Sequence, residues 1–295
     1  VSNPTGPVGV IDEDRQAGIK GELGTPPAST LVRTVVTGPN GRSRTGDTRV
    51  SVPDFVSTAT AFGFLANLDR VFDHVGKGST YVRFTISGRT AAGAPFQVAR
   101  TNRYASRDDV TASSISEPAS AVDALIDNDF TGLTLDQVRI DASLSDQVRA
   151  YRIARVQVRV KKTWRTVGPA SVVRVTHGRR ILMRIVLGSR RNELGTRTVR
   201  ASLRMPAATP RGATGMVQVG ADTGLDGTGG DASLGGAEPT SFAQLIRSLQ
   251  TAPRNDEIPL SLLLDASESG TPVAQSRTQV GSVVTGARQF TVRVR

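Results

Sequence analysis

The chain has 295 residues, no cysteine and a formal net charge of +11. This length allows one large domain or two of ordinary size. The absence of cysteine excludes disulfides and thiolate metal sites. No apolar run approaches the ~18–20 residues that span a bilayer, so no transmembrane segment is predicted. The sequence begins at Val1 without a signal peptide, so either a leader has been removed or the chain is a fragment of a longer protein.

The composition favours strands and turns over long helices. Hydrophobic residues make up 38% of the chain but aromatic residues only 4%, so Val, Leu, Ile and Ala must fill the core. Val and Thr are abundant, and the 30 glycines and 15 prolines supply turns. We therefore predict a mainly β protein with a few helices, of the α+β class.

The basic charge is carried almost entirely by arginine, because the lysines are only Lys20, Lys77, Lys161 and Lys162. Such a bias fits a GC-rich genome as well as it fits a ligand. The arginines are spread along the sequence, and no motif combines them with aromatic residues. We therefore interpret them as solvated strand faces and predict no nucleic-acid partner.

The first informative block is Pro7–Gly24, which combines alternating apolar residues, a charged break and regularly spaced glycines. Val8 and Val10 alternate with small or polar neighbours, as in a half-buried strand. After the charged break, Ile19 and Leu23 are expected to be buried again. The block therefore predicts strand, turn, strand.

The acidic residues of that block, Asp12, Glu13 and Asp14, suggest a cation site. Arg15 and Lys20 lie close by in the sequence and would neutralise the same carboxylates. We favour this structural role and predict no metal site.

The first half of the chain then mixes strands with helices. Residues 30–37 form a β-rich run, and the Gly-Pro-Asn-Gly turn signal at 38–41 predicts a hairpin. Apolar residues spaced by three and four predict an amphipathic helix over 52–75. A second helix is predicted over 115–126, with Pro118 in its first turn. Strands are expected at 81–87 and 96–104.

From about Leu133 the pattern is nearly pure strand with short turns, which predicts an antiparallel, Ig-like β-sandwich. We therefore divide the chain into a first domain over 1–132 and a sandwich domain over 133–295. The second domain would contain a Gly/Asp-rich loop over 220–238 and a closing helix over 240–251, capped by Thr240 or Ser241. Closing strands are expected at 258–264 and 290–294.

The Gly/Asp-rich loop also suggests calcium, through Asp222, Asp226, Gly227 and Asp231. The two positions that an EF-hand loop needs for ligands three and twelve are Gly224 and Ser233, so the pattern fails. A linker is the favoured interpretation, and no cofactor is predicted.

The two histidines give no catalytic arrangement. His74 lies at the end of the first predicted helix, where a cation complements the helix dipole, and His177 precedes Gly178 in a turn. No Gly-x-Ser-x-Gly pattern is present to present a nucleophile. Trp164, in the run Lys161-Lys162-Thr-Trp164-Arg165, forms either a cation–π surface or binding hot spot, or the tip of a hairpin that covers a sandwich edge. We favour the hairpin.

Several blocks in order resemble the C-terminal half of the SpoIVB-type serine peptidase family, and more narrowly its secreted actinobacterial branch. The first block resembles the family's Gly-x-(Ile/Val/Leu)-x-x-Asp-Arg-x-x-Gly segment. The resembling segments are Val8–Ile19, Gly41–Gly46, Tyr104–Asp108, Arg174–Gly215 and Phe242–Glu257. The resemblance implies that residues 1–132 are the end of a β-rich peptidase domain and that the sandwich is appended to it.

The family's catalytic segments are missing from this chain. Its nucleophile lies in a Gly-Met-Ser-Gly-Ser-Pro segment and its histidine in a Gly-His-Pro segment, and neither occurs here. Gly215-Met216 is followed by Val217, so it is not the nucleophile motif. The resemblance therefore implies a non-catalytic C-terminal portion of a serine endopeptidase, with no catalytic, cofactor-binding or metal-binding residue of its own.

The same resemblance implies a partner and a location. The partner would be the N-terminal half of the same precursor, or another protein chain, with self-association as a further possibility. Apolar surface near the N-terminus should then be exposed. The location would be extracellular or in the cell envelope. The alternative is a non-enzymatic extracellular structural or adhesion protein, such as a matrix or filament subunit.

Overall fold

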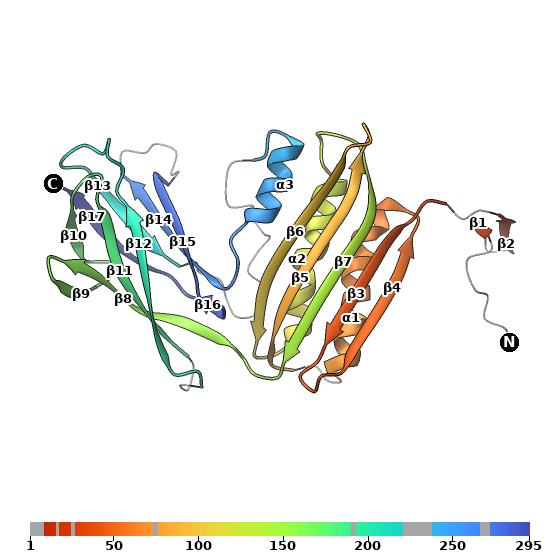
Figure 1. Ribbon diagram of the computed structural model, residues 1–295, viewed down its shortest axis with the longest axis horizontal. Coiled ribbons are helices and arrows are strands. Elements are labelled where there is room, and N and C mark those ends of the chain that lie inside the picture. The colour runs from red at the N-terminus through yellow and green to blue at the C-terminus, as the bar shows by residue number, and fades with distance from the viewer. Residues whose placement is uncertain are drawn as a thin grey trace.

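The fold is mainly β with three α-helices in the residues that the structure describes, as the composition predicts. The computed structural model describes residues 9–15, 18–24, 27–72, 76–189, 193–220, 238–265 and 272–295. Two separate hydrophobic cores divide most of this chain into an N-terminal region and a C-terminal region, and a small N-terminal hairpin belongs to neither core. Figure 1 shows the two regions side by side.

The N-terminal region is a five-stranded sheet whose inner face is covered by two helices (Figure 1). The alternating burial along its strands puts Val32, Phe84 and Ile140 against the helices. From the helix side, Phe64 and Leu125 complete this core. The strand order is β4-β3-β7-β5-β6. The elements are β3 (Thr30–Thr37), β4 (Ser43–Val50), α1 (Val56–Phe72), β5 (Gly78–Thr90), β6 (Pro95–Ser106), α2 (Val110–Ile126) and β7 (Leu133–Ser145).

Local signals predicted most of these elements correctly. The Gly-Pro-Asn-Gly turn joins β3 and β4 in the expected hairpin. A short 3₁₀ turn, η1 (Pro53–Phe55), precedes α1. The second helix begins at Val110, five residues earlier than predicted, because the Asp109 carboxylate accepts from the amides of Thr111 and Ala112. Pro118 therefore lies inside α2, and its placement in the first turn was wrong.

Strand β7 corrects the predicted organisation. It was expected to open the sandwich at 133, but it lies in the middle of the first sheet, parallel to β3 and antiparallel to β5. The buried residues Val138 and Ile140 join the helix-covered core. The change of region therefore comes after Ser145.

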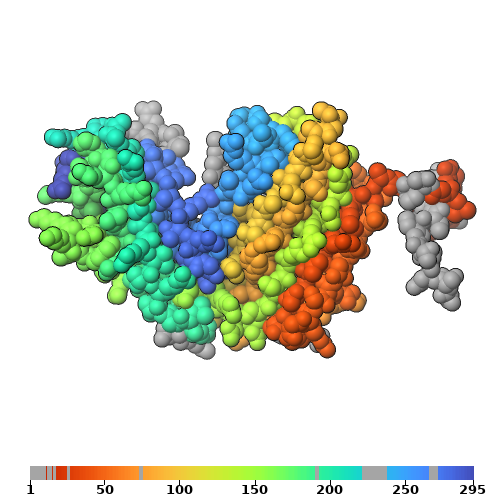
Figure 2. Space-filling model, viewed as in Figure 1, coloured from red at the N-terminus to blue at the C-terminus, as the bar shows by residue number. Residues whose placement is uncertain are grey.

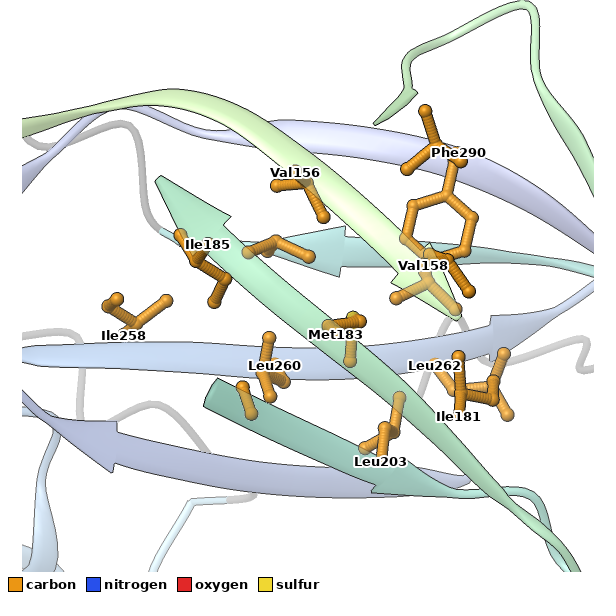
Figure 3. Close-up of a cluster of buried hydrophobic side chains, with 14 of the residues drawn as sticks. Val156, Val158, Ile181, Met183, Ile185, Leu203, Ile258, Leu260, Leu262 and Phe290 are labelled. Carbon is orange, nitrogen blue, oxygen red and sulfur yellow. The ribbon is translucent and has the colours of Figure 1, made fainter. Parts of the chain in front are cut away.

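The C-terminal region consists of two sheets that share one core. One sheet has the order β12-β11-β8-β16, with β9 also paired to β8, and the other has the order β10-β17-β13-β14-β15. Figure 3 shows how Val156 and Ile185, from the sheet that contains β8 and β11, meet Leu260 and Phe290, from the sheet that contains β14 and β17. The strands are β8 (Ala150–Val160), β9 (Thr163–Val167), β10 (Val172–Val175), β11 (Arg180–Gly188), β12 (Thr196–Arg204), β13 (Thr214–Val219), β14 (Glu257–Leu264), β15 (Ala274–Gln279), β16 (Val283–Thr285) and β17 (Arg288–Val294).

The sequence predicted purely antiparallel pairing in this region, and this prediction was wrong. Strand β16 runs parallel to β8, and β10 runs parallel to β17. Both exceptions pair strands that are far apart in the sequence, so no tight turn joins them and imposes the antiparallel direction. The two predicted closing strands are present as β14 and β17.

Helix α3 (Phe242–Thr251) belongs to the second half of the sequence but packs on the first region (Figure 1). Ser241 caps it, as one of the two predicted candidates. Leu245 and Leu249 enter the core of the N-terminal region, and the Phe242 ring meets Phe96 of β6 edge to face. The helix therefore fastens the two regions together instead of closing the sandwich.

Candidate functional site

A buried polar cluster joins the two regions and has Glu117 of α2 at its centre. The Glu117 carboxylate accepts from Arg100 and Tyr104, and from the Asn102 amide at 2.6 Å; these three donors lie on β6. The remaining Arg100 nitrogens donate to the carbonyl oxygens of Ala252 and Pro253, at 2.8 and 2.9 Å. The cluster therefore ties the segment after α3 to the first sheet.

The two charges of this cluster, Arg100 and Glu117, neutralise each other. The Arg100 side chain is only 4% exposed and that of Glu117 13%, so removing either charge would leave the other buried without a counter-charge. Burial, and then the negative charge of Glu117, raise the pKa of the Tyr104 phenol well above its ordinary value. The phenol therefore stays protonated and donates its hydrogen, which makes it a structural group and not a base.

The turn at Arg254–Glu257 forms the other side of the joint. The backbone N–H of Asn255 donates to the side-chain Oδ1 of Asn102 at 2.8 Å, and the side-chain Nδ2 of Asn255 donates to the backbone carbonyl of Arg103 at 3.0 Å. The buried Asp256 carboxylate lies 3.5 Å from both Arg103 and Arg254. One of the segments that carry the family resemblance, Phe242–Glu257, therefore supplies one side of this contact between regions.

An open cleft of about 640 Å³ lies beside this joint. Its charged lining comes from Arg83, Arg100, Arg254, Arg277 and Glu257. Three of these arginines are engaged, since Arg100 pairs with Glu117 while Arg254 and Arg277 lie 2.9 and 3.9 Å from Glu257. The lining that the structure describes contains no histidine, serine or cysteine; its hydroxyl groups are those of threonines.

The two predicted strands are present as a hairpin of β1 (Gly9–Arg15) and β2 (Gly18–Leu23), but the charged break predicted at Asp12–Arg15 is part of strand β1. Its predicted burial was wrong, because Ile19 and Leu23 are 67% and 88% exposed, and Ile11 is 64% exposed. Ile11 is paired with Gly21, which shares a face with Ile19 and Leu23. These three apolar side chains therefore form one exposed face, here called the apolar hairpin face. Figure 1 shows the hairpin away from both regions.

Most of the other sequence-predicted candidates stay untested. His74 and the loop residues Asp222, Gly224, Asp226, Gly227, Asp231 and Ser233 lie outside the described residues, as do the side chains of Asp12, Glu13 and Asp14. Exposed His177 lies in the turn between β10 and β11, as predicted. Among the described residues, no three His, Asp or Glu side chains are grouped in a way that would hold a metal. None of the described helices is long and apolar enough to cross a bilayer.

Trp164 combines the two interpretations that its sequence allowed. It lies on β9, which forms a hairpin with β8 at the edge of the sheet. Its ring also stacks with a cation, because the Arg184 guanidinium lies 4.2 Å from the ring centroid.

Comparisons with protein-family models, with curated proteins and with solved structures found no match. The resemblance to the SpoIVB-type peptidases therefore stays a prediction from the quoted motifs.

The sequence analysis missed the concentration of charge in the C-terminal region. Residues 147–221 hold 17 of the 37 Lys and Arg residues but only one of the 26 acidic residues, Glu193. This quarter of the chain has a formal charge of +16, and the rest has −5. Nearly half of the basic residues thus lie in one region that has almost no acidic residues to balance them. Counting charge in windows, instead of over the whole chain, would have revealed this.

Proposed function

We propose that this chain is the non-catalytic C-terminal portion of a SpoIVB-like serine endopeptidase, made of the end of the peptidase domain and an Ig-like sandwich. The nucleophile and the histidine would lie on a preceding segment of the same precursor. The chain would dock on that segment through the apolar hairpin face, outside the cell or in its envelope.

The apolar hairpin face is the observation that carries this proposal. A two-stranded hairpin is marginally stable by itself in water, and three large apolar side chains on one face call for a covering surface. No described residue outside the hairpin covers Ile11, Ile19 or Leu23 to any large extent. In the resembling family this block follows shortly after the catalytic histidine, so the peptidase half is the expected cover.

The joint between the regions supports a structural role for one other resembling segment, Phe242–Glu257. Its residues Asn255 and Asp256 are engaged in contacts with Arg103 of β6. Residues so committed to packing are better suited to hold an architecture than to cleave a peptide bond.

The first test is chemical. The isolated chain is expected to stay unlabelled by a fluorophosphonate probe for activated serines, and stoichiometric labelling would overturn the proposal. The reading frame upstream of Val1 should encode the Gly-Met-Ser-Gly-Ser-Pro and Gly-His-Pro segments. A frame without them would equally overturn it.

The second test concerns the apolar hairpin face. The upstream segment, expressed separately, should bind this chain, and Ile19→Ser with Leu23→Ser should abolish that binding. Val172→Ser is the matched control, since Val172 is 63% exposed on β10 in the other region. Equal binding by the double variant and the control would show that the hairpin is not the contact.

A structural or adhesion protein is the second candidate. Among the strands that the structure describes, β4 pairs with β3 alone, so its outer edge is open to strand addition from a neighbouring molecule. The test is concentration-dependent self-association of the chain and of the variant Thr45→Pro, which removes a backbone N–H from β4. Self-association that this substitution abolishes would favour the structural candidate over the peptidase.

A further inference from the structure

The strongest unassigned feature is the outer face of the sheet that contains β8, β9, β11 and β12. Alternation turns Ile181, Met183 and Ile185 into the core and leaves their neighbours outside. Six arginines project from this outer side, here called the basic face: Arg155, Arg159, Arg180, Arg184, Arg200 and Arg204. In Figure 2 these strands lie in the green and teal part of the surface, at the left of the view.

The charges of the basic face are not balanced within it. Strands β8, β9, β11 and β12 contain no Asp or Glu. Arg184 lies directly opposite Arg200, and Arg180 directly opposite Arg204. Like charges in directly opposed positions destabilise a sheet. The arrangement therefore costs stability, which points to a ligand that supplies the missing negative charge.

Apolar groups lie among these arginines. Trp164 is directly opposite Arg159 on the neighbouring strand, and Leu182, 38% exposed, lies between Arg180 and Arg184 along β11. Trp is an aromatic residue that favours the boundary between lipid headgroups and hydrocarbon, where its ring is apolar and its N–H is hydrated. The face thus combines many basic side chains with two partly exposed apolar ones.

We propose that the basic face binds the surface of an anionic lipid bilayer through its phosphate groups. Arginine suits this role because its planar guanidinium binds phosphate through two parallel hydrogen bonds. The arginines extend over three neighbouring strands, which matches a two-dimensional array of phosphates better than one linear chain.

A single-stranded nucleic acid is the less favoured ligand. Such binding uses several aromatic rings on which bases stack. Trp164 is the one aromatic residue on the outer side of these described strands, and Arg184 already occupies a face of its ring. This inference does not depend on the peptidase proposal, because it rests on a different surface.

The test uses the whole chain and vesicles of phosphatidylglycerol and phosphatidylcholine in equal parts. The variant Arg155→Gln/Arg159→Gln/Arg200→Gln/Arg204→Gln removes four exposed charges for which no partner is found among the described residues. Its matched control is Arg42→Gln/Arg49→Gln/Arg70→Gln/Arg89→Gln, which lowers the net charge equally in the N-terminal region. Thermal melting should show that both variants fold.

The wild-type chain is expected to co-sediment with these vesicles and not with pure phosphatidylcholine. The basic-face variant should bind about a hundredfold more weakly, and the control should bind nearly as wild type. The emission of the chain's single Trp should shift to the blue on vesicle addition. Equal losses in both variants, or tighter binding to a single-stranded oligonucleotide that the basic-face variant alone loses, would overturn the proposal.

Discussion

Each of the two regions exposes the outer face of a β-sheet, and both faces carry arginines. The two faces differ in whether acidic side chains neutralise these arginines. In the N-terminal sheet, Arg33 lies opposite Asp47 and bonds it in bidentate fashion, at 2.8 and 2.6 Å. Arg139 makes a similar pair with Asp141 on its own strand. In the C-terminal sheet, Arg184 lies opposite Arg200. The arginines named on the first face are neutralised by acidic side chains of the same sheet. Those on the second face have no such counter-charge within their sheet.

The largest effect is expected where a charge pair is buried. Glu117→Gln removes the carboxylate that neutralises Arg100, which leaves a buried guanidinium without its counter-charge. We expect a loss of about 3 kcal/mol in the free energy of unfolding, measured by urea denaturation. Glu193→Gln is the control, because Glu193 is exposed and lies 3.9 Å from Arg107. Equal effects of the two substitutions would contradict the structural importance of the joint.

A smaller effect is expected from making the basic face resemble the other one. Arg200→Glu places an acid directly opposite Arg184, as Asp47 lies opposite Arg33. We expect up to about 1 kcal/mol of added stability at low salt, together with weaker vesicle binding. The reciprocal change, Arg33→Glu, should destabilise the chain. If Arg200→Glu also destabilised it, the claim that this face is strained by like charge would fail.

The smallest effect concerns the neutralised pair itself. The hydrogen bond from Arg33 lowers the pKa of Asp47. Since the folded pKa lies below the unfolded one, the pair contributes stability above the unfolded pKa and loses it as pH falls through the folded value. Asp47→Asn should remove this acid-side component, with little change at neutral pH because the pair is exposed. Urea melts across the acidic range would reveal it, and Asp136→Asn, whose carboxylate lies 4.0 Å from Arg89, is the comparison.

The positions of strands and helices depend on neighbouring residues and were predictable from the sequence. The sheet or core that each element joins was not predictable. Alternation identified the strand over Thr30–Thr37, and Ser241 marked the start of α3. Alternation says which side chains share a face but not which sheet a strand joins, so β7 was placed in the wrong region. In the same way, nothing near Leu245 and Leu249 in the sequence indicates that they enter the core of the other region.

The candidate surfaces were predictable in part. Exposed apolar surface near the N-terminus was expected from the family resemblance, although Ile19 and Leu23 were at first interpreted as buried. The polar joint at Glu117 was missed, because it depends on contacts between segments more than a hundred residues apart, such as Arg100 and Ala252. The basic face was missed because the overall charge conceals its uneven distribution.

The most direct test of the contrast between the two regions is arginine modification by phenylglyoxal, mapped by peptide mass spectrometry with and without anionic vesicles. We expect vesicles to protect Arg155, Arg159, Arg200 and Arg204 while Arg42, Arg49 and Arg70 react as before. Protection that is equal in the two regions, or confined to the N-terminal one, would contradict the account.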